Sequence, residues 1–342
     1  GEVRVFYYYN RTWNPMGDVL RGVGQFGISM DLSANGQYLA VGGNLGSGSP
    51  TVLNPNGVKG HVRVYKYKHH AWEAHGDPVE GDEQKENLGW SVSISGDGSK
   101  IAVGSPSYGK SGKGRVQIFT YQQGQWQPQD HSISEGLGVK GMGYVVSLSS
   151  NGDRLAVVSR TRLAHRATRP KITVWRQVNG TRWIPMGSPI IRLGNQVDNL
   201  GQRVELSGDG TTLVVAAKFQ HARAHGFTQA YKFIGNKWIE LGQTLDDYAE
   251  DTVASVSVNH NGTHICIGSP GMDNVNQGGR VRVYQFHDDG WWYKVGEDIQ
   301  GPHGFGSAVS LAADASNVAI GAGPYHSNTG LARIYARHPE AE

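Results

Sequence analysis

The residues best suited to chemistry are the basic and histidine side chains of two long predicted loops, residues 160–171 and 218–225. Guanidinium groups hold carboxylate, sulfate or phosphate groups through paired N–H donors, so these loops suggest a site for an anionic ligand. A contact with an acidic protein and a solvated surface are the alternatives. The candidate ligand-binding residues are Arg160, Arg162, His165, Arg166, Arg169, Lys171, Lys218, His221, Arg223 and His225.

Acidic residues gather in two other connections, at 77–86 and 246–251. Opposed charges on one molecule suit head-to-tail association between copies of the chain. Carboxylate clusters on loops are more often solvated than metal-binding, and His69, His70 and His75 lack a further ligand fixed by the sequence. We therefore expect no metal and no cofactor.

Recognisable catalytic motifs are missing from the sequence. It has no Gly-x-Ser-x-Gly, no His-Glu-x-x-His and no phosphate-binding loop, so we predict no catalytic residues. A lyase or glycosidase that acts on an acidic polysaccharide, with a histidine and a tyrosine as base and acid, is the alternative from another class.

Composition excludes several further classes. The net charge is +3 over 342 residues, and Phe219 and Phe227 are the only aromatic residues near the basic loops, so we expect no nucleic-acid partner. No run of 18 apolar residues occurs, so we expect no membrane insertion. The single cysteine, Cys266, lies in an apolar run and is predicted to be a core residue. Asn-x-Ser/Thr acceptors for glycans occur at Asn10, Asn179 and Asn261.

These candidate residues are positioned by an internal repeat of about 52 to 62 residues. Each unit begins with a short alternating strand, an Asn-Gly or Asp-Gly turn, and an apolar second strand, as in residues 29–42. A third strand then opens at glycine and alternates valine with polar residues, as in 60–65. The unit ends with a Trp-x-x-x-Gly strand, which we call the tryptophan strand. The six repeat tryptophans are Trp13, Trp72, Trp126, Trp183, Trp238 and Trp292, with Asp130 in place of the glycine once.

Four short strands per unit and no helical periodicity predict an all-β fold, a β-propeller of four-stranded blades. The sequence contains six first strands, six second strands, seven third strands and six tryptophan strands. Six blades are favoured, with seven as the alternative, and the Trp13 strand would complete the last blade and close the ring. We predict a single domain over 1–342, with units at about 1–22, 23–81, 82–136, 137–194, 195–247, 248–301 and 302–342.

The repeats resemble the FG-GAP type of propeller repeat found in the heads of integrin alpha chains. The matching segments are Gln25-Phe26-Gly27 and Gly304-Phe305-Gly306 before a first strand, and Val103-Gly104-Ser105-Pro106, Ile267-Gly268-Ser269-Pro270 and Ile320-Gly321-Ala322-Gly323-Pro324 after a second strand. The resemblance covers the whole chain. It implies a secreted protein that serves adhesion, glycan binding or assembly.

The chain departs from integrin-type blades at the turn between the first and second strands. Asp97-Gly98 and Asp209-Gly210 offer too few oxygens for calcium, and they resemble the tight turns of WD-type repeats. We therefore expect a non-catalytic extracellular binding or assembly module whose partner is another protein, a copy of itself or an anionic polysaccharide. An intracellular WD-like scaffold is a further alternative.

Trp90 is placed at the entrance of a first strand, where Phe26 and Phe305 stand in other units.

Overall fold

The computed structural model describes most of the chain. The described residues are 1–10, 12–44, 59–83, 85–109, 111–129, 133, 139–162, 168–191, 199–218, 226–246, 253–271, 278–323 and 330–337. Of the predicted ligand-binding residues, His165, Arg166, His221, Arg223 and His225 lie outside them.

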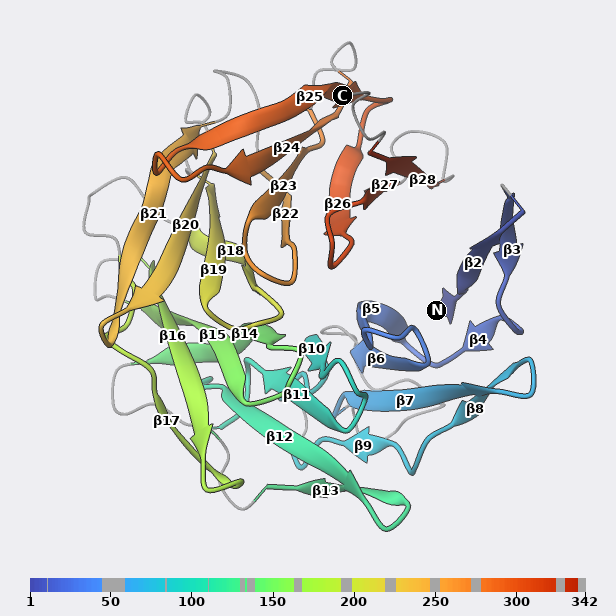
Figure 1. The fold of residues 1–342 in the computed structure, drawn as a ribbon. Helices are drawn as coiled ribbons and strands as arrows, with labels where there is room; N and C mark the ends of the chain where they lie inside the picture. Colours follow the sequence, from blue (N-terminus) through green and yellow to red (C-terminus); the bar gives the residue numbers. More distant parts are fainter. Residues whose placement is uncertain are drawn as a thin grey trace. The chain divides into compact units, whose positions relative to one another are not determined.

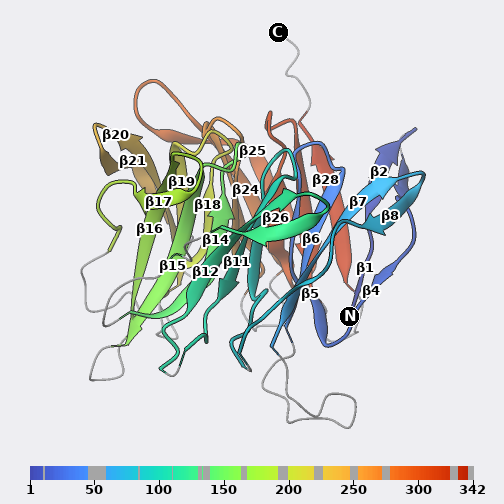
Figure 2. The ribbon, with the colours of Figure 1, turned by 90° about the horizontal axis from the view of Figure 1, so that it is seen from below.

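Six sheets follow one another along the sequence, each with its strands in chain order (Figure 1). The first sheet holds β5 (Gln25–Leu32), β6 (Tyr38–Asn44), β7 (His61–Lys68) and β8 (Ala71–Ala74), and β9 (Val79–Glu80) also pairs with β7. The second sheet holds β10 (Ser91–Ile94), β11 (Lys100–Ser105), β12 (Arg115–Gln122) and β13 (Gln125–Pro128). The third sheet holds β14 (Lys140–Leu148), β15 (Arg154–Arg162), β16 (Thr168–Val178) and β17 (Arg182–Pro185). In Figure 2 the strands β14, β15 and β16 run side by side, as their pairing requires.

The next three sheets repeat this order. They are β18 (Asn199–Leu206), β19 (Thr212–Lys218), β20 (Phe227–Ile234) and β21 (Lys237–Asp246); β22 (Ser255–Val258), β23 (His264–Ser269), β24 (Arg280–Phe286) and β25 (Trp292–Gln300); and β26 (Phe305–Leu311), β27 (Asn317–Ala322) and β28 (Leu331–Ala336). Two small sheets pair β1 (Glu2–Val3) with β4 (Leu20–Arg21), and β2 (Phe6–Tyr9) with β3 (Thr12–Pro15).

This is the fold of a six-bladed β-propeller, and the predicted fold class is confirmed. The predicted numbers of first, second, third and tryptophan strands all agree with the observed strands, and no helix occurs among the described residues. Within the described part of the chain, β3 pairs with β2, with Tyr8 opposite Trp13, and β28 pairs with β27. Closure of the ring by the Trp13 strand stays a prediction.

The turn between the first and second strands explains why the sequence repeats Asn-Gly and Asp-Gly. The residue after the Asn or Asp lies in the left-handed region in every unit, with φ of 68° at Gly36, 74° at Gly98 and 61° at Ala315. The Asp97 carboxylate accepts hydrogen bonds from the Ser95 hydroxyl at 2.6 Å and the Ser99 amide at 2.9 Å. Burial acts to raise the pKa of Asp97, but these hydrogen bonds outweigh it and hold that pKa below its ordinary value.

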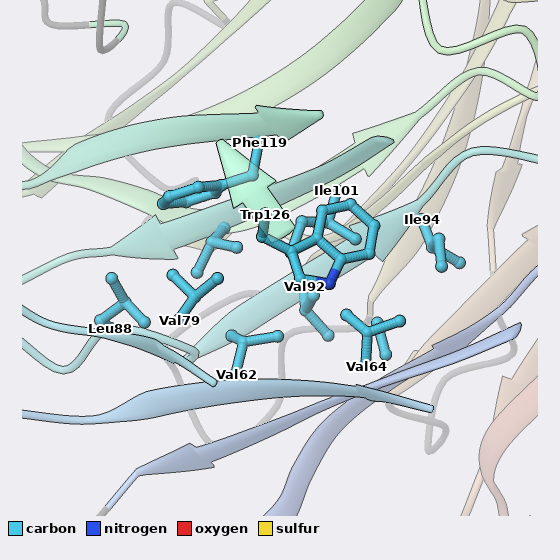
Figure 3. Packing of buried hydrophobic residues seen from close by; sticks show 11 residues of the cluster. Val62, Val64, Val79, Leu88, Val92, Ile94, Ile101, Phe119 and Trp126 are labelled. Atoms are coloured by element: carbon cyan, nitrogen blue, oxygen red, sulfur yellow. The ribbon is translucent and has the colours of Figure 1, made fainter. Parts of the chain in front are cut away.

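Tryptophans form the centre of the packing between neighbouring sheets. Trp126 is 7% exposed and packs with Val64, Ile101 and Phe119, which come from three strands of two consecutive sheets (Figure 3). Its indole N–H donates to the His75 carbonyl at 2.7 Å. Trp126 therefore joins the sheet of β10 to β13 to the sheet before it, that of β5 to β8.

By its contacts the chain divides into two compact units, residues 1–162 with 175–184, and 163–174 with 185–342. Each unit has its own apolar clusters of β-branched and aromatic side chains. Cys266 is buried in the second unit, as expected, and burial raises the pKa of its thiol above the usual range. The single-domain assignment stays a prediction.

Candidate functional site

Part of the predicted basic surface belongs to the described residues. Arg160 and Lys171 lie on β15 and β16 with described side chains, while for Arg162, Arg169 and Lys218 only the strand position is described. Arg160 is opposite Lys140 of the neighbouring strand β14, so two basic residues are cross-strand partners at one end of this sheet. The gathering of the remaining basic residues around them stays a prediction.

Arg160 lies against an aromatic side chain that sequence reasoning did not select. Its guanidinium carbon is 3.7 Å from the centre of the Tyr144 ring, a cation–π contact. Tyr144 reaches this place because β14 has an irregular register between Lys140 and Val145. Gly141 and Gly143 lie in that segment with φ of 61° and 85°, a conformation that suits glycine.

Trp90 extends the aromatic surface. Its ring centre is 5.6 Å from that of Tyr144, at an interplanar angle of 42°, and Trp90, Tyr144 and Arg160 are all half-buried. Together they form what we call the Arg160 platform, and all three residues belong to the first compact unit. The platform combines aromatic faces with one fixed positive charge.

The structure corrects the expected place of Trp90. Leu88, not Trp90, takes the repeat position of Phe26 and Phe305. Leu88 forms a bridge with Gly60, as Met142 does with Gly114 in the next unit. The side chains of Leu88 and Met142 are fully or almost fully buried. Counting two residues onward from Leu88 and Met142 places Trp90 and Tyr144 at one repeat position in consecutive units. This alignment is the sequence signal that could have paired them.

The Arg160 platform suits an anion that carries an apolar surface. The Tyr144 ring covers one face of the Arg160 guanidinium. Among the described residues, the N–H groups of this guanidinium have no hydrogen-bond acceptor. Those N–H donors can therefore hold a carboxylate or sulfate side by side, while the rings of Trp90 and Tyr144 contact C–H groups.

The acidic connection at 77–86 is partly a structural element. Glu86 is fully buried, and its carboxylate accepts a bond from the Arg115 guanidinium at 3.0 Å, while Asp82 accepts another at 2.6 Å. Tyr108 covers the Arg115 guanidinium at 3.8 Å. Burial raises the pKa of Glu86, and the Arg115 charge opposes that shift. Those two carboxylates therefore neutralise a buried arginine. Of the other acidic connection only Asp246 is described, at the end of β21.

Of the histidines considered for zinc, His75 has a packing role. His75 stacks on Tyr121, with ring centres 3.7 Å apart, and burial lowers its pKa. His69 and His70 form a hairpin turn with φ of 50° and 65°. Across the described residues, no three His, Cys, Asp or Glu side chains come together as a metal site would need.

Comparisons with known proteins support the fold. The structure is similar to a periplasmic gluconolactonase of Pseudomonas aeruginosa, with a TM-score of 0.58 and 13% identity, over 97% of this chain and 94% of that one. It is similar to a GH74 enzyme of Niastella koreensis, with a TM-score of 0.53 and 13% identity, over 94% of this chain and 47% of that one. It is also similar to a 6-phosphogluconolactonase-like protein of Bacteroides uniformis, with a TM-score of 0.50 and 13% identity, over 88% of this chain and 92% of that one.

At this identity the likeness concerns the fold alone. Enzymes are among the similar structures, so this architecture is compatible with catalysis as well as with binding. No protein-family model matches the sequence, so the FG-GAP assignment stays a prediction. No curated protein matches either. In the part of the chain that the structure describes, no helix is long and apolar enough to cross a membrane.

Proposed function

We propose that this protein is a non-catalytic extracellular module that binds an anionic polysaccharide at the Arg160 platform and assembles with copies of itself. The observation that carries the binding role is the stacking of Arg160 on Tyr144 at 3.7 Å. A stacked guanidinium keeps its edge donors in a fixed plane, which reduces the conformational entropy lost when a carboxylate or sulfate binds.

The extracellular setting is supported by the three glycan acceptors. Asn10, Asn179 and Asn261 are exposed in turns between strands, where an oligosaccharide can be attached without disturbing the packing. The single cysteine is buried and unreactive, so nothing in the described chain depends on a reducing compartment.

Binding to a panel of sulfated, carboxylated and neutral glycans across a salt series tests the binding role. We expect affinity for the anionic members only, weakening as salt rises because the contact is ionic. Replacing Arg160 with serine should weaken binding at least about tenfold, since a charge-assisted hydrogen bond contributes roughly 1.5–3 kcal/mol.

Arg176→Ser is the matched control, because Arg176 is an exposed arginine away from the platform and its loss should leave binding unchanged. Equal loss in both variants would indicate non-specific attraction by net charge. Absence of binding to every member would reject the binding role, and shortening of a bound glycan would reject the non-catalytic one.

A further inference from the structure

Asparagine followed by glycine occurs five times in the sequence, and four of these pairs lie in described turns. Asn56-Gly57 lies outside the described residues. In such a pair the amide nitrogen of glycine can approach the side-chain carbonyl carbon of asparagine, because glycine has no Cβ atom to hinder it. The described pairs are Asn35-Gly36, Asn151-Gly152, Asn179-Gly180 and Asn261-Gly262.

The reaction open to such a pair is deamidation, and water is its only other reactant. The glycine nitrogen loses its proton and attacks the Cγ atom of asparagine. A bond forms between these two atoms, the Cγ–Nδ2 bond breaks, and the Nδ2 atom leaves as ammonia. Water then opens the resulting succinimide ring at either carbonyl carbon, which gives aspartate or isoaspartate. The first step requires that the glycine N–H and the asparagine side chain are both free to move.

Three of the pairs hold both reacting groups in hydrogen bonds. These pairs form the turns between first and second strands, where Gly36, Gly152 and Gly262 donate to the carbonyl three residues earlier at 2.8–3.2 Å. In each pair the asparagine Oδ1 atom accepts a hydrogen bond from a nearby hydroxyl group at 2.7–2.8 Å. The hydroxyl donors are Ser33, Ser149 and Thr263. Each of these turns must therefore break two hydrogen bonds before the reaction begins.

Asn179-Gly180 lies in a different turn, between β16 and β17, and neither reacting group is held. Both residues are exposed, with φ of 52° and 76°. Among the described residues, the Asn179 side chain and the Gly180 N–H have no hydrogen-bond partner. A Cβ atom added at Gly180 would meet no described atom within 4 Å, so the space around this residue is open. The Gly180 carbonyl, which does not react, accepts a hydrogen bond from the Gln177 side chain at 2.7 Å.

We propose that Asn179 is a deamidation site, and that it converts in the folded protein while the other three described pairs are protected. The whole turn belongs to the first compact unit, so its geometry is local. The product carries a negative charge, and its isoaspartate form adds a methylene group to the backbone. A glycan would be attached to the same Nδ2 atom that leaves, so deamidation removes this glycan acceptor from any chain that is not already glycosylated there. Neither glycan binding nor assembly is needed for the reaction.

Peptide mass mapping of the full chain, produced without glycans and incubated at mildly alkaline pH, measures each pair separately. Replacement of the side-chain NH₂ by OH raises the mass of the peptide that contains it. We expect the Asn179 peptide to convert at least about tenfold faster than the peptides of Asn35, Asn151 and Asn261, because those pairs must first break two hydrogen bonds. The three protected pairs are matched controls within the same molecule. Equal rates at all four sites would overturn the proposal, as would an Asn179 that stays intact.

Two further measurements separate the effect of structure from that of local sequence. In urea the hydrogen bonds of the three protected turns are lost, so their asparagines should convert at rates close to that of Asn179. A preference for Asn179 that is as large in urea as in the folded chain would contradict the structural cause. Gly180→Ala places a methyl group beside the attacking nitrogen, and it should slow conversion at Asn179 while leaving the other three rates unchanged. An unchanged rate at Asn179 in that variant would exclude attack by this nitrogen.

Discussion

Removing the Trp126 side chain should destabilise the protein far more than removing that of Trp13. Trp126 is 7% exposed, packs with Val64, Ile101 and Phe119, and donates a 2.7 Å hydrogen bond to His75. Replacement of a buried tryptophan by alanine costs about 3–5 kcal/mol, because apolar contacts are lost and a cavity remains. Trp13 is 45% exposed, and exposed substitutions usually change stability by no more than about 0.5 kcal/mol.

Urea denaturation followed by far-ultraviolet circular dichroism measures both effects. The protein concentration should be low enough that every variant is monomeric, so that association does not contribute to stability. We expect Trp126→Ala to lower the midpoint strongly with an unchanged slope, and Trp13→Ala to leave it nearly unchanged. Trp126→Phe keeps a ring but loses the N–H donor, and should cost about 1 kcal/mol for the lost hydrogen bond in addition to any change in packing.

A loss below about 1 kcal/mol in Trp126→Ala would contradict the burial of this indole, since removing a buried aromatic side chain costs more than that. Equal losses in the Trp126 and Trp13 variants would show that the monomer itself buries both indoles.

Two further predictions concern a turn and the glycan acceptors. Because hydrogen bonds hold the pKa of Asp97 below its ordinary value of 3.8, its ionised form stabilises the fold above that pH, and the gain is lost as pH falls through the folded pKa. The difference in unfolding free energy between the wild type and Asp97→Asn should therefore shrink below pH 3.8; a difference that is constant with pH would contradict this. Protein made through a secretory route should lose mass on enzymatic deglycosylation. The extracellular assignment would be contradicted if no glycan were attached at Asn10, Asn179 or Asn261.

The repeat made the fold predictable because its signals are local. Alternating valines, glycine turns and one tryptophan per unit determine which segments become strands and in which order they pair. The left-handed φ values at Gly36 and Gly98 agree with the Asn-Gly and Asp-Gly turns read from the sequence. The burial of Cys266 followed in the same way from the apolar residues around it.

The candidate site was only partly predictable. Arg160 was selected from its charge, but Tyr144 was not, because the bulge at 140–145 that brings the ring under the guanidinium has no distinctive local pattern. The acidic run at 77–86 looked like a solvated surface, yet Glu86 is buried against Arg115. Trp90 was assigned to the repeat position that Leu88 occupies, because Gly89 stands between the two residues and made either alignment acceptable.

The sequence by itself therefore determined the class of fold, the strand types and the excess of basic residues at 160–171 and 218–225; the described ones lie on β15, β16 and β19 and not in the predicted loops. Tertiary structure alone decided that Arg160 stacks on Tyr144 and that Glu86 neutralises Arg115. The physical reason is the sequence separation of the residues that interact. Strand and turn formation depends on neighbours a few residues apart, whereas these contacts join residues on different strands, which only packing and register bring together.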